Sequence, residues 1–294
     1  MMGALPRVDT AIIGGSGLYA MAELDNPRKL NVYTPFGPPS DLVRIGTMGD
    51  KQVAFLARHG SGHRLLPSDI NFRANIFALK QLGVKRIISA SAVGSMREKI
   101  HPRDVVLVDQ FIDRSLRRPA TFFGDGIVAH IAFADPICTE TRSALLEAAK
   151  KVGARAHDGG TYLAMEGPAF STRAESKLYR SWDVDVIGMT NVQEAKLARE
   201  AEICYSTLAL VTDFDCWHVD ENDVTVAELL ENLEVNAKLA VKIIREAVAQ
   251  LPAERENCVC ANALEHAILT DLQKAPAETL ERLRPIVGRY CRPA

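Results

Sequence analysis

The stretch TAIIGGSGL at residues 10–18 joins a β-branched apolar run to a turn rich in glycine. Short apolar runs that end in turn residues are typical of buried strands. The glycines let backbone N–H groups approach an anion closely, and Ser16 adds a hydroxyl donor. This stretch therefore predicts a strand that opens into a phosphate-binding loop, although a tight turn without a ligand also fits.

Comparable apolar runs recur along the chain and alternate with segments of helical periodicity. Further buried strands are predicted at Gln52–Ala57, Arg86–Ala90, Val105–Asp109, Val184–Gly188 and Ile203–Val211. Apolar residues three or four apart predict helices at Asn71–Leu82, Glu140–Val152, Glu194–Glu202 and Val226–Leu251. Strands that alternate with helices favour an α/β fold around a central sheet.

The pattern changes after Pro252, which follows the last long helix. We predict one domain over residues 1–252 and a C-terminal helical extension over 253–294, packed on the same domain or on a neighbouring subunit. Within the extension we expect a helix at Asn262–Lys274 and an amphipathic piece around Leu280 and Leu283.

Composition excludes several classes of protein. The 294 residues are 47% hydrophobic and 24% charged, which is ordinary for a globular chain, and the net charge of −2 offers no broad attraction to nucleic acid or anionic lipid. No apolar run is long enough to span a membrane, and the first residues lack the pattern of a signal peptide. We expect a cytoplasmic protein.

Six cysteines are present, and reduced thiols are the default for an unsecreted chain of this length. Cys258 and Cys260 form a C-x-C pair, which is too closely spaced for a zinc finger. We therefore predict no metal site and leave open whether this pair is reduced or forms a disulfide.

Polar groups follow several predicted strands. Arg58 and His59 come directly after one strand, where a guanidinium fork and an imidazole suit an oxyanion, although capping of a strand end is the alternative. Small residues around Ser91 and Ala92 follow the next strand and would let a ligand reach the backbone. Thr190 ends another strand and offers a hydroxyl, or an N-cap for the next helix.

Two further segments suit a flat ring. Phe170 and Ser171 follow a Gly-Pro turn, and an aromatic face can stack on a base, although an ordinary core phenylalanine is the alternative. Met189 offers a soft apolar surface. Asp213 and Asp215 follow a buried run and point to one side if the backbone is extended, where crowding would raise a carboxyl pKa and favour proton donation.

These segments, taken in order, closely resemble the trimeric or hexameric purine nucleoside phosphorylase family. The matching strings run from residue 14 to residue 217 and are GGSGLY, TPFGPPSD, LARHG, the small-residue loop ending VGS, PRDVVLVDQFIDR, MEGPAFSTRAES, IGMTNVQEAKLA and TDFDCW. TPFG, DQFIDR and TDFDCW are specific to the branch that acts on methylthioadenosine. The resemblance implies a single α/β domain with a central mixed, twisted β-sheet flanked by helices.

The resemblance also implies roles for individual residues. The phosphate site would comprise Ser16, Arg58, His59, Ser91, Ala92 and Thr190. Met189 would lie under the ribose, Phe170 and Ser171 would border the base, and catalytic Asp213 and Asp215 would face the purine N7 and its exocyclic amine. An apolar pocket for a methylthio group would comprise Val226, Leu229 and Leu230, which also fit the core stripe of a helix. His130 resembles the residue that a neighbouring subunit contributes near the 5' substituent.

The implied activity is phosphate-dependent cleavage of 5'-methylthioadenosine, with no cofactor and inorganic phosphate as co-substrate. The implied partners are other copies of the chain, in a homotrimer or a dimer of trimers. In some archaeal relatives cysteines like Cys258 and Cys260 form disulfides.

Three alternatives remain. A 6-oxopurine phosphorylase would act on inosine or methylthioinosine, although Asp213 favours a 6-amino group. A dinucleotide-binding dehydrogenase would use Gly15, Gly17 and Ala20 as G-x-G-x-x-A, but residues 31–35 lack the acidic residue that this fingerprint needs. A relative that only binds nucleoside or phosphate is the third.

Overall fold

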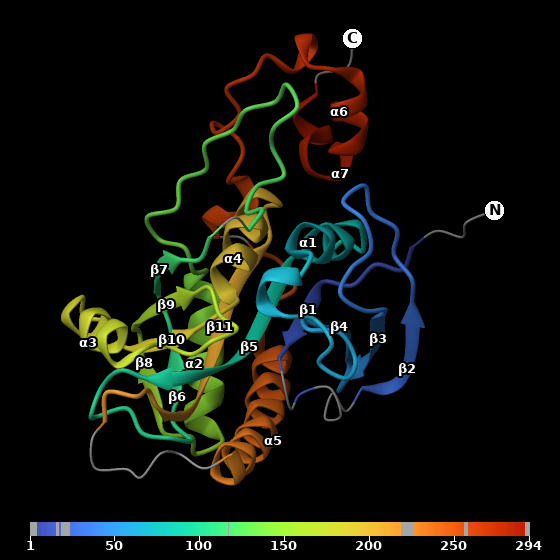
Figure 1. Ribbon diagram of the computed structural model, residues 1–294. Helices are drawn as coiled ribbons and strands as arrows, with labels where there is room; N and C mark the ends of the chain where they lie inside the picture. The colour runs from blue at the N-terminus through green and yellow to red at the C-terminus, as the bar shows by residue number, and fades with distance from the viewer. Residues whose placement is uncertain are drawn as a thin grey trace.

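The computed structural model describes residues 5–15, 18, 24–116, 118–218, 226–255 and 258–291, and in α5 (Val226–Gln250) it describes side chains from residue 230 onward. A mixed sheet of eleven strands forms the centre, and helices flank it (Figure 1). The prediction of a single α/β domain with a central mixed sheet is confirmed. In the described part of the chain, no helix has both the length and the apolar character needed to cross a bilayer.

The sheet is organised around β5 (Arg86–Ser95), which pairs with three strands. It runs parallel to β1 (Thr10–Gly14) and to β11 (Cys204–Phe214), and its last residues pair antiparallel with β10 (Val186–Gly188). The remaining strands extend these three branches: β4 (Lys51–Ala57), β3 (Val43–Met48) and β2 (Asp25–Leu30) beyond β1; β9 (Thr161–Met165) and β7 (Gln110–Arg114) beyond β10; β6 (Val105–Leu107) and β8 (Ala156–Asp158) beyond β11.

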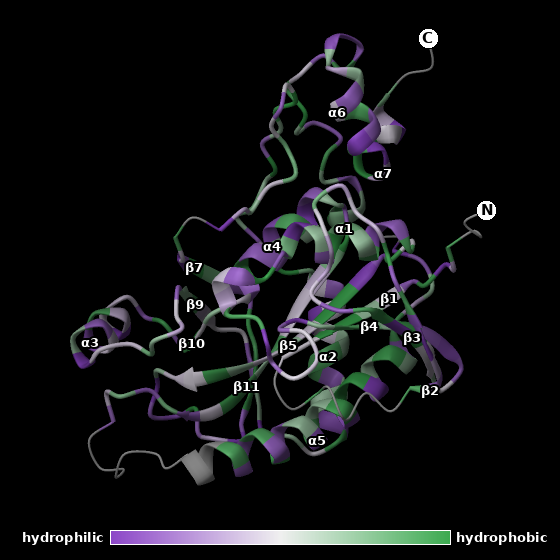
Figure 2. Ribbon diagram, turned by 45° about the vertical axis from the view of Figure 1, so that its right-hand side comes forward, coloured by the Kyte–Doolittle hydropathy of each residue, from purple (hydrophilic) through white to green (hydrophobic). Residues whose placement is uncertain are grey.

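Two layers of helices bury the two faces of the sheet, each through an apolar stripe (Figure 2). α1 (Phe72–Gln81) and α4 (Asn191–Glu200) share one buried cluster, and α2 (Thr139–Lys151) and α5 share the other. These four helices match the predicted ones, because each carries an apolar stripe that must be buried. Asn71 caps α1 by accepting a 3.1 Å hydrogen bond from the Ala74 N–H.

The C-terminal extension packs at least partly on its own chain. Its helices are α6 (Ala277–Arg282) and α7 (Arg284–Val287), as the amphipathic pattern predicted. Leu283, Ile286 and Val287 are buried in the same cluster as α1. Figure 1 shows this extension above α1, with the segment after β7 rising beside it.

The predicted helix at Asn262–Lys274 is wrong. Only two 3-10 turns occur there, η2 (Val259–Asn262) and η3 (Leu272–Lys274). Between them the chain pairs with a distant loop: the His130 N–H donates to the Ala267 carbonyl at 2.8 Å, and the Leu269 N–H to the Val128 carbonyl at 2.9 Å. This long-range pairing overrides the local helical pattern.

Five strands and one helix were not predicted. The missed strands are β2, β3, β7, β8 and β9, and β2 illustrates the cause, because five of its six residues are exposed and it carries no apolar pattern. The missed helix α3 (Arg173–Ser181) begins with a capping box, in which Thr172 and Glu175 bond each other's backbone N–H groups.

Candidate active site

A small pocket lies where β1 ends beside β5, beneath α5. It is lined by Gly15, Leu18, Ala90, Ser91, Ala92, Leu210, Leu233, Asn236 and Ala237. The glycine-rich turn and the small-residue segment of β5, two separate sequence predictions, therefore meet around one hollow. Ser16 itself lies outside the described residues.

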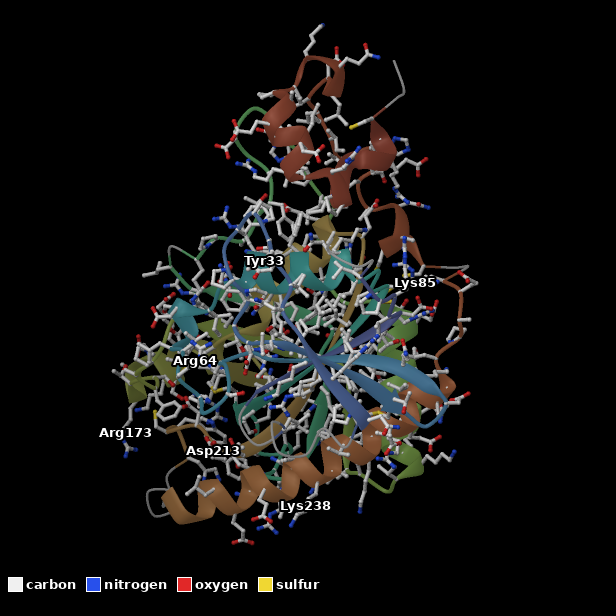
Figure 3. All side chains as sticks on the ribbon, turned by 90° about the vertical axis from the view of Figure 1, so that its right-hand side faces the viewer. Tyr33, Arg64, Lys85, Arg173, Asp213 and Lys238 are labelled. Carbon is white, nitrogen blue, oxygen red and sulfur yellow. The ribbon has the colours of Figure 1, made fainter. Side chains whose placement is uncertain are left out.

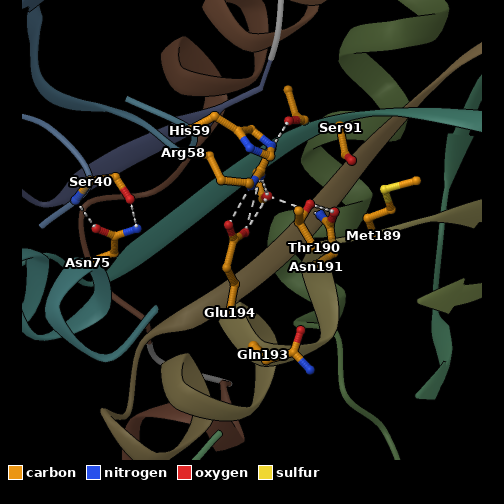
Figure 4. A network of polar contacts seen from close by, with 12 residues as sticks. Ser40, Arg58, His59, Asn75, Ser91, Met189, Thr190, Asn191, Gln193 and Glu194 are labelled. Carbon is orange, nitrogen blue, oxygen red and sulfur yellow. Dashed lines mark hydrogen bonds and ion pairs between the residues drawn. The ribbon is translucent and has the colours of Figure 1, made fainter. Parts of the chain in front are cut away.

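Arg58 follows β4 and turns back under this pocket. Its side chain is only 1% exposed, and its Nε donates to Glu194 Oε1 at 2.6 Å in a fully buried ion pair (Figure 4). Nη1 donates to the Ala90 carbonyl at 3.0 Å, and a Cβ built on Gly15 would lie 3.1 Å from the same nitrogen. The guanidinium thus lies against the glycine-rich turn, and its orientation is fixed by a carboxylate that the sequence analysis did not single out.

A buried polar network holds that carboxylate in place. Glu194 Oε2 accepts hydrogen bonds from Ser89 Oγ and Tyr205 Oη, each at 2.8 Å. Asn191 donates to Ser89 Oγ at 3.1 Å and to Tyr205 Oη at 3.0 Å. Burial raises the pKa of Tyr205 well above its usual value, so this hydroxyl remains a donor. The network joins β5, β11 and the first turn of α4.

His59 is neutral near pH 7. Burial, and next the nearby Arg58 charge, lower its pKa to about 4. Its Nδ1 donates to the Leu65 carbonyl at 2.8 Å, and its ring stacks on His63 with 4.3 Å between ring centres. In this tautomer Nε2 is an acceptor.

Met189 and Thr190 directly follow β10, and Figure 4 shows Thr190 next to Asn191 and close to the Arg58–Glu194 pair. Thr190 is 4% exposed and occupies the N-cap position of α4 without making a capping bond; its hydroxyl contacts Asn191 Oδ1 at 3.3 Å. Met189 lies against Gly167, where a Cβ would come within 2.5 Å of its sulfur.

Arg118, in the segment after β7, holds Met189 and Glu166 in place, and no sequence motif marks it. Its side chain is nearly buried and donates to the carbonyls of Met189 and Glu166. It also forms a 3.2 Å ion pair with the Glu166 carboxylate. The turn around Gly167 and the end of β10 are therefore held together by one guanidinium.

Asp213 and Asp215 both lie beside Gly94 of β5. A Cβ built on Gly94 would lie 3.2 Å from Asp213 Oδ1 and 3.6 Å from Asp215 Cβ. The register between β11 and β5 shifts between Val211 and Asp213. Ser171 Oγ donates to the Asp215 carboxylate at 2.9 Å, so two segments predicted to border a base are in contact.

Two asparagines of α5 support this strand end. Asn236 donates to the Val211 carbonyl at 2.7 Å, and Asn232 donates to the Thr212 carbonyl at 2.8 Å. Thr212 Oγ1 in turn donates to Asp213 Oδ2 at 2.6 Å. Figure 3 shows Asp213 beside the N-terminal part of α5, at the end of the molecule opposite the C-terminal extension. Neither asparagine was singled out from the sequence.

The other predicted ligand residues lie less centrally. Phe170 is 77% exposed, so it is not a core residue, and Leu230 on α5 is 59% exposed. The side chains of Val226 and Leu229 lie outside the described residues. His130 lies beside the C-terminal extension, bonded through its backbone to Ala267, away from the Asp213 end of β11.

The structure also gathers four of the six cysteines, which are all free thiols. Sulfur atoms of Cys138, Cys204, Cys258 and Cys260 lie within 4.8 Å of one another. For the cysteines, the prediction of no metal site depends on the close spacing of Cys258 and Cys260. Cys138 and Cys204 are far from Cys258 and Cys260 in the sequence, so no motif spacing links them to this pair.

Two different parts of the candidate site lie along one strand, one suited to an anion and one suited to the polar edge of a heterocycle. The glycine-rich turn and Ala90, Ser91 and Ala92 line the pocket, and Arg58 bonds to the Ala90 carbonyl and to Ser89 Oγ. The side chains of Asp213 and Asp215 lie beside Gly94, three residues after Ser91 along β5. Such a pairing suits a molecule with a polar heterocycle whose reacting carbon must meet an oxyanion.

Known proteins that are similar to this chain in sequence and fold are phosphorylases. A family model described as the phosphorylase superfamily matches residues 9–249. The chain is 55% identical to an S-methyl-5'-thioadenosine phosphorylase of Gloeobacter violaceus, with 97% of each chain covered. A methylthioadenosine phosphorylase from an antarctic soil metagenomic library has a TM-score of 0.91 at 49% identity, covering 95% of this chain and 99% of that one. A mutant adenosine/methylthioadenosine phosphorylase from Schistosoma mansoni, in complex with methylthioadenosine, has a TM-score of 0.79 at 37% identity, covering 85% and 93%.

Proposed function

Because this chain belongs to the phosphorylase superfamily, we propose that it cleaves 5'-methylthioadenosine with inorganic phosphate, releasing adenine and 5-methylthioribose 1-phosphate. It is a pentosyltransferase, and the reaction serves purine and methionine salvage. The observation that carries the proposal is the spacing of two sets of residues along β5: the pocket formed by the glycine-rich turn and Ser91, and the two aspartates beside Gly94.

Phosphate would bind between the glycine-rich turn, the ends of β4 and β10, and the middle of β5. We assign it to Ser16, Arg58, His59, Ser91, Ala92 and Thr190. The buried Glu194 carboxylate holds Arg58 in position through its Nε at 2.6 Å. A neutral His59, whose Nε2 is an acceptor, suits a phosphate that still carries one proton, because that proton can be donated to the ring.

Breaking the N-glycosidic bond builds positive charge on the ribose and negative charge on the leaving purine, as in glycoside cleavage. The bound phosphate is both the nucleophile and a nearby anion. A protonated Asp213 would donate to N7, so that adenine leaves neutral, and such general acid catalysis contributes about 10²–10⁴-fold. The reaction transfers a ribosyl group without changing any oxidation state, so we propose that it needs no cofactor.

Selectivity for the base would come from Asp213 and Asp215. A carboxylate accepts a hydrogen bond from the 6-amino group of adenine, which favours adenine over a 6-oxopurine. Ser171 fixes Asp215 through bonds of 2.9 Å to both carboxylate oxygens. Phe170, exposed in the single chain, would stack on the ring, and Met189 would lie under the ribose.

Selectivity at the 5' position would come from the start of α5. Val226, Leu229 and Leu230 would surround the methylthio group, and a 5'-hydroxyl there would lose hydration at a cost of roughly 1–3 kcal/mol. Adenosine should therefore be a poorer substrate. His130 of a neighbouring subunit would complete this pocket, because within one chain it lies beside the C-terminal extension.

We accordingly propose a homotrimer or a dimer of trimers. The support is that large apolar side chains near the site are exposed in a single chain, as Phe170 is at 77% and Leu116 at 70%. We also propose a cytoplasmic location, because reduced thiols are the default for cysteines there and none of the six is paired in a disulfide in this structure.

The test is product formation from methylthioadenosine, adenosine, methylthioinosine and inosine, each with and without phosphate. We expect phosphate-dependent release of adenine, fastest from methylthioadenosine. Faster release of hypoxanthine would favour the 6-oxopurine alternative and overturn the roles assigned to Asp213. Absence of any release would favour a protein that only binds nucleoside.

A further inference from the structure

Four cysteines from three distant parts of the chain converge at the base of the C-terminal extension. Cys138 precedes α2, Cys204 begins β11, Cys258 lies just before η2, and Cys260 lies within η2. Their four sulfur atoms all lie within 4.8 Å of one another, with Cys204 and Cys258 at 3.2 Å and Cys138 and Cys258 at 3.5 Å. We call this set the cysteine cluster.

The size of the cluster matches one metal ion. Zinc binds thiolate sulfur at about 2.3 Å, so the sulfurs of a tetrahedral site lie about 3.8 Å apart. Four sulfurs are also the complete ligand set of a closed structural site, with no open position for a water or a substrate. The C-x-C pair can contribute two ligands because Cys258 has extended backbone and the 3-10 turn begins immediately after it.

We propose that the cysteine cluster binds one structural Zn²⁺. On binding, four thiols lose their protons to solvent and four thiolate sulfurs coordinate the ion, which leaves the site with a net charge of −2. Groups around the cluster fit that charge. The Thr141 hydroxyl donates to Cys138 Sγ at 3.5 Å, and Arg255 Nη1 donates to Cys204 Sγ at 3.9 Å. Such outer partners orient metal-bound thiolates.

The cluster is well shielded from water. Cys138, Cys204 and Cys260 are 2%, 0% and 2% exposed, and Cys258 is partly buried against them. Arg255 also donates to the Glu202 carbonyl at 2.8 Å, which links the start of the extension to the segment before β11. A zinc ion here would join the extension to α2 and to the sheet at a single point.

The proposed zinc site is structural because it lies far from the residues assigned to catalysis. Cys204 is the first residue of β11 and Asp213 is nine residues further along the same strand. At about 3.3 Å per residue the two positions are about 30 Å apart. Loss of the metal should therefore weaken attachment of the extension and lower the thermal stability, while kcat of the remaining folded enzyme stays unchanged.

The experiment measures the zinc content of the untagged protein, purified without added metal or chelator, by elemental mass spectrometry. We expect one zinc ion per chain. The double variant Cys258→Ser/Cys260→Ser should lose it, whereas the control Cys216→Ser/Cys291→Ser should keep it because these two cysteines lie outside the cluster. Reconstitution of the wild-type chain with Co²⁺ should give the visible absorption of tetrahedral cobalt–thiolate coordination.

A thiol count on denatured wild-type protein keeps the proposal testable if the double variant does not fold. With chelator present, six thiols per chain should react, and the released zinc should equal the chain concentration. Six reactive thiols without any zinc would overturn the proposal. Fewer than six, restored by a reductant, would mean disulfides in place of the metal and would overturn it as well.

Discussion

At Asp213 the proposed chemistry depends on one proton. Asp213→Asn keeps the size of the side chain and removes the acid, so kcat for methylthioadenosine should fall by about 10²–10⁴-fold. Activity on 6-oxo nucleosides should fall less, because an amide N–H can donate to a 6-oxo group. Steady-state kinetics of the variant and the wild type on both substrates measures how far each kcat falls. An unchanged kcat for methylthioadenosine would contradict the proposed role of Asp213.

A substitution of Phe170 offers a second test at the level of a single residue. Its side chain is 77% exposed in the single chain, so Phe170→Ala should leave the melting temperature of the fold almost unchanged. Loss of a stacking partner worth about 0.5–1.5 kcal/mol should raise KM for methylthioadenosine about 2- to 13-fold. Phe170→Tyr keeps the aromatic face and should restore KM. If alanine and tyrosine give the same KM, Phe170 does not contact the base.

Sequence reasoning identified individual residues best where a polar group follows an apolar strand. Arg58, Thr190 and Asp213 stand out for that reason, and the resemblance joined them into one site. Glu194, in contrast, has the spacing of an ordinary polar residue on a helix. Only the fold reveals that it is fully buried beneath Arg58, because that contact spans 136 positions of the chain.

Among the elements, β4 and α4 are joined by the Arg58–Glu194 pair. Glu194→Gln would leave the Arg58 charge buried without its partner, which costs about 3–5 kcal/mol. We expect a lower melting temperature and, in the protein that remains folded, a higher KM for phosphate with little change in KM for the nucleoside. Glu234→Gln breaks an exposed pair with Lys238 and is the matched control. Equal melting temperatures for the two variants would contradict the structural role of the buried pair.

The end of α4 carries a pH-dependent contact. Burial raises the pKa of Glu200 from 4.5 to about 7, while its carboxyl accepts bonds from Thr121 and the Phe122 N–H. A raised folded-state pKa means that the contribution to stability is complete below pH 4.5 and is lost as pH rises through 7. That loss amounts to roughly 3 kcal/mol.

Glu200→Gln cannot ionise, so its stability should fall less between pH 5 and pH 8 than that of the wild type. Denaturant unfolding at the two pH values measures the difference. His59, whose pKa is lowered to about 4, acts in the opposite direction below pH 6.5 in both proteins and cancels in the comparison. Identical pH dependence in the two proteins would show that Glu200 stays ionised when folded.

Elements with a regular apolar pattern were predicted, and those formed by distant pairing were not. The four large helices carry continuous stripes, so their local sequence is sufficient. The segment 262–274 has the spacing of a helix, yet Ala267 and Leu269 pair with the loop around Val128 and His130. Strand β2 has almost no buried residue and is defined only by its hydrogen bonds to β3.

At the scale of the whole molecule, the assembly is the main prediction. Light scattering should give the mass of three or six chains. His130→Ala should raise KM for methylthioadenosine, and mixed oligomers of His130→Ala with Asp213→Asn chains should regain activity, because some sites then combine an intact Asp213 with an intact His130 from a neighbour. An active monomer, or mixtures without recovery, would remove His130 from the shared site.

The cysteine cluster is a feature that only the complete fold reveals. Cys138 and Cys204 give no metal-binding signal next to Cys258 and Cys260, because their positions in sequence are far apart. Strand pairing and the return of the extension bring the four sulfurs together.

Strand β5 carries Ser91 at the proposed phosphate site and Gly94 beside the two aspartates. Three residues of extended backbone set these positions about 10 Å apart, and a paired strand cannot stretch or shrink. The strand therefore fixes the distance between the proposed phosphate site and the two aspartates. An inhibitor that joins an anionic group to a purine-like edge should bind only when its own length fits that interval, whatever group it carries at the 5' end.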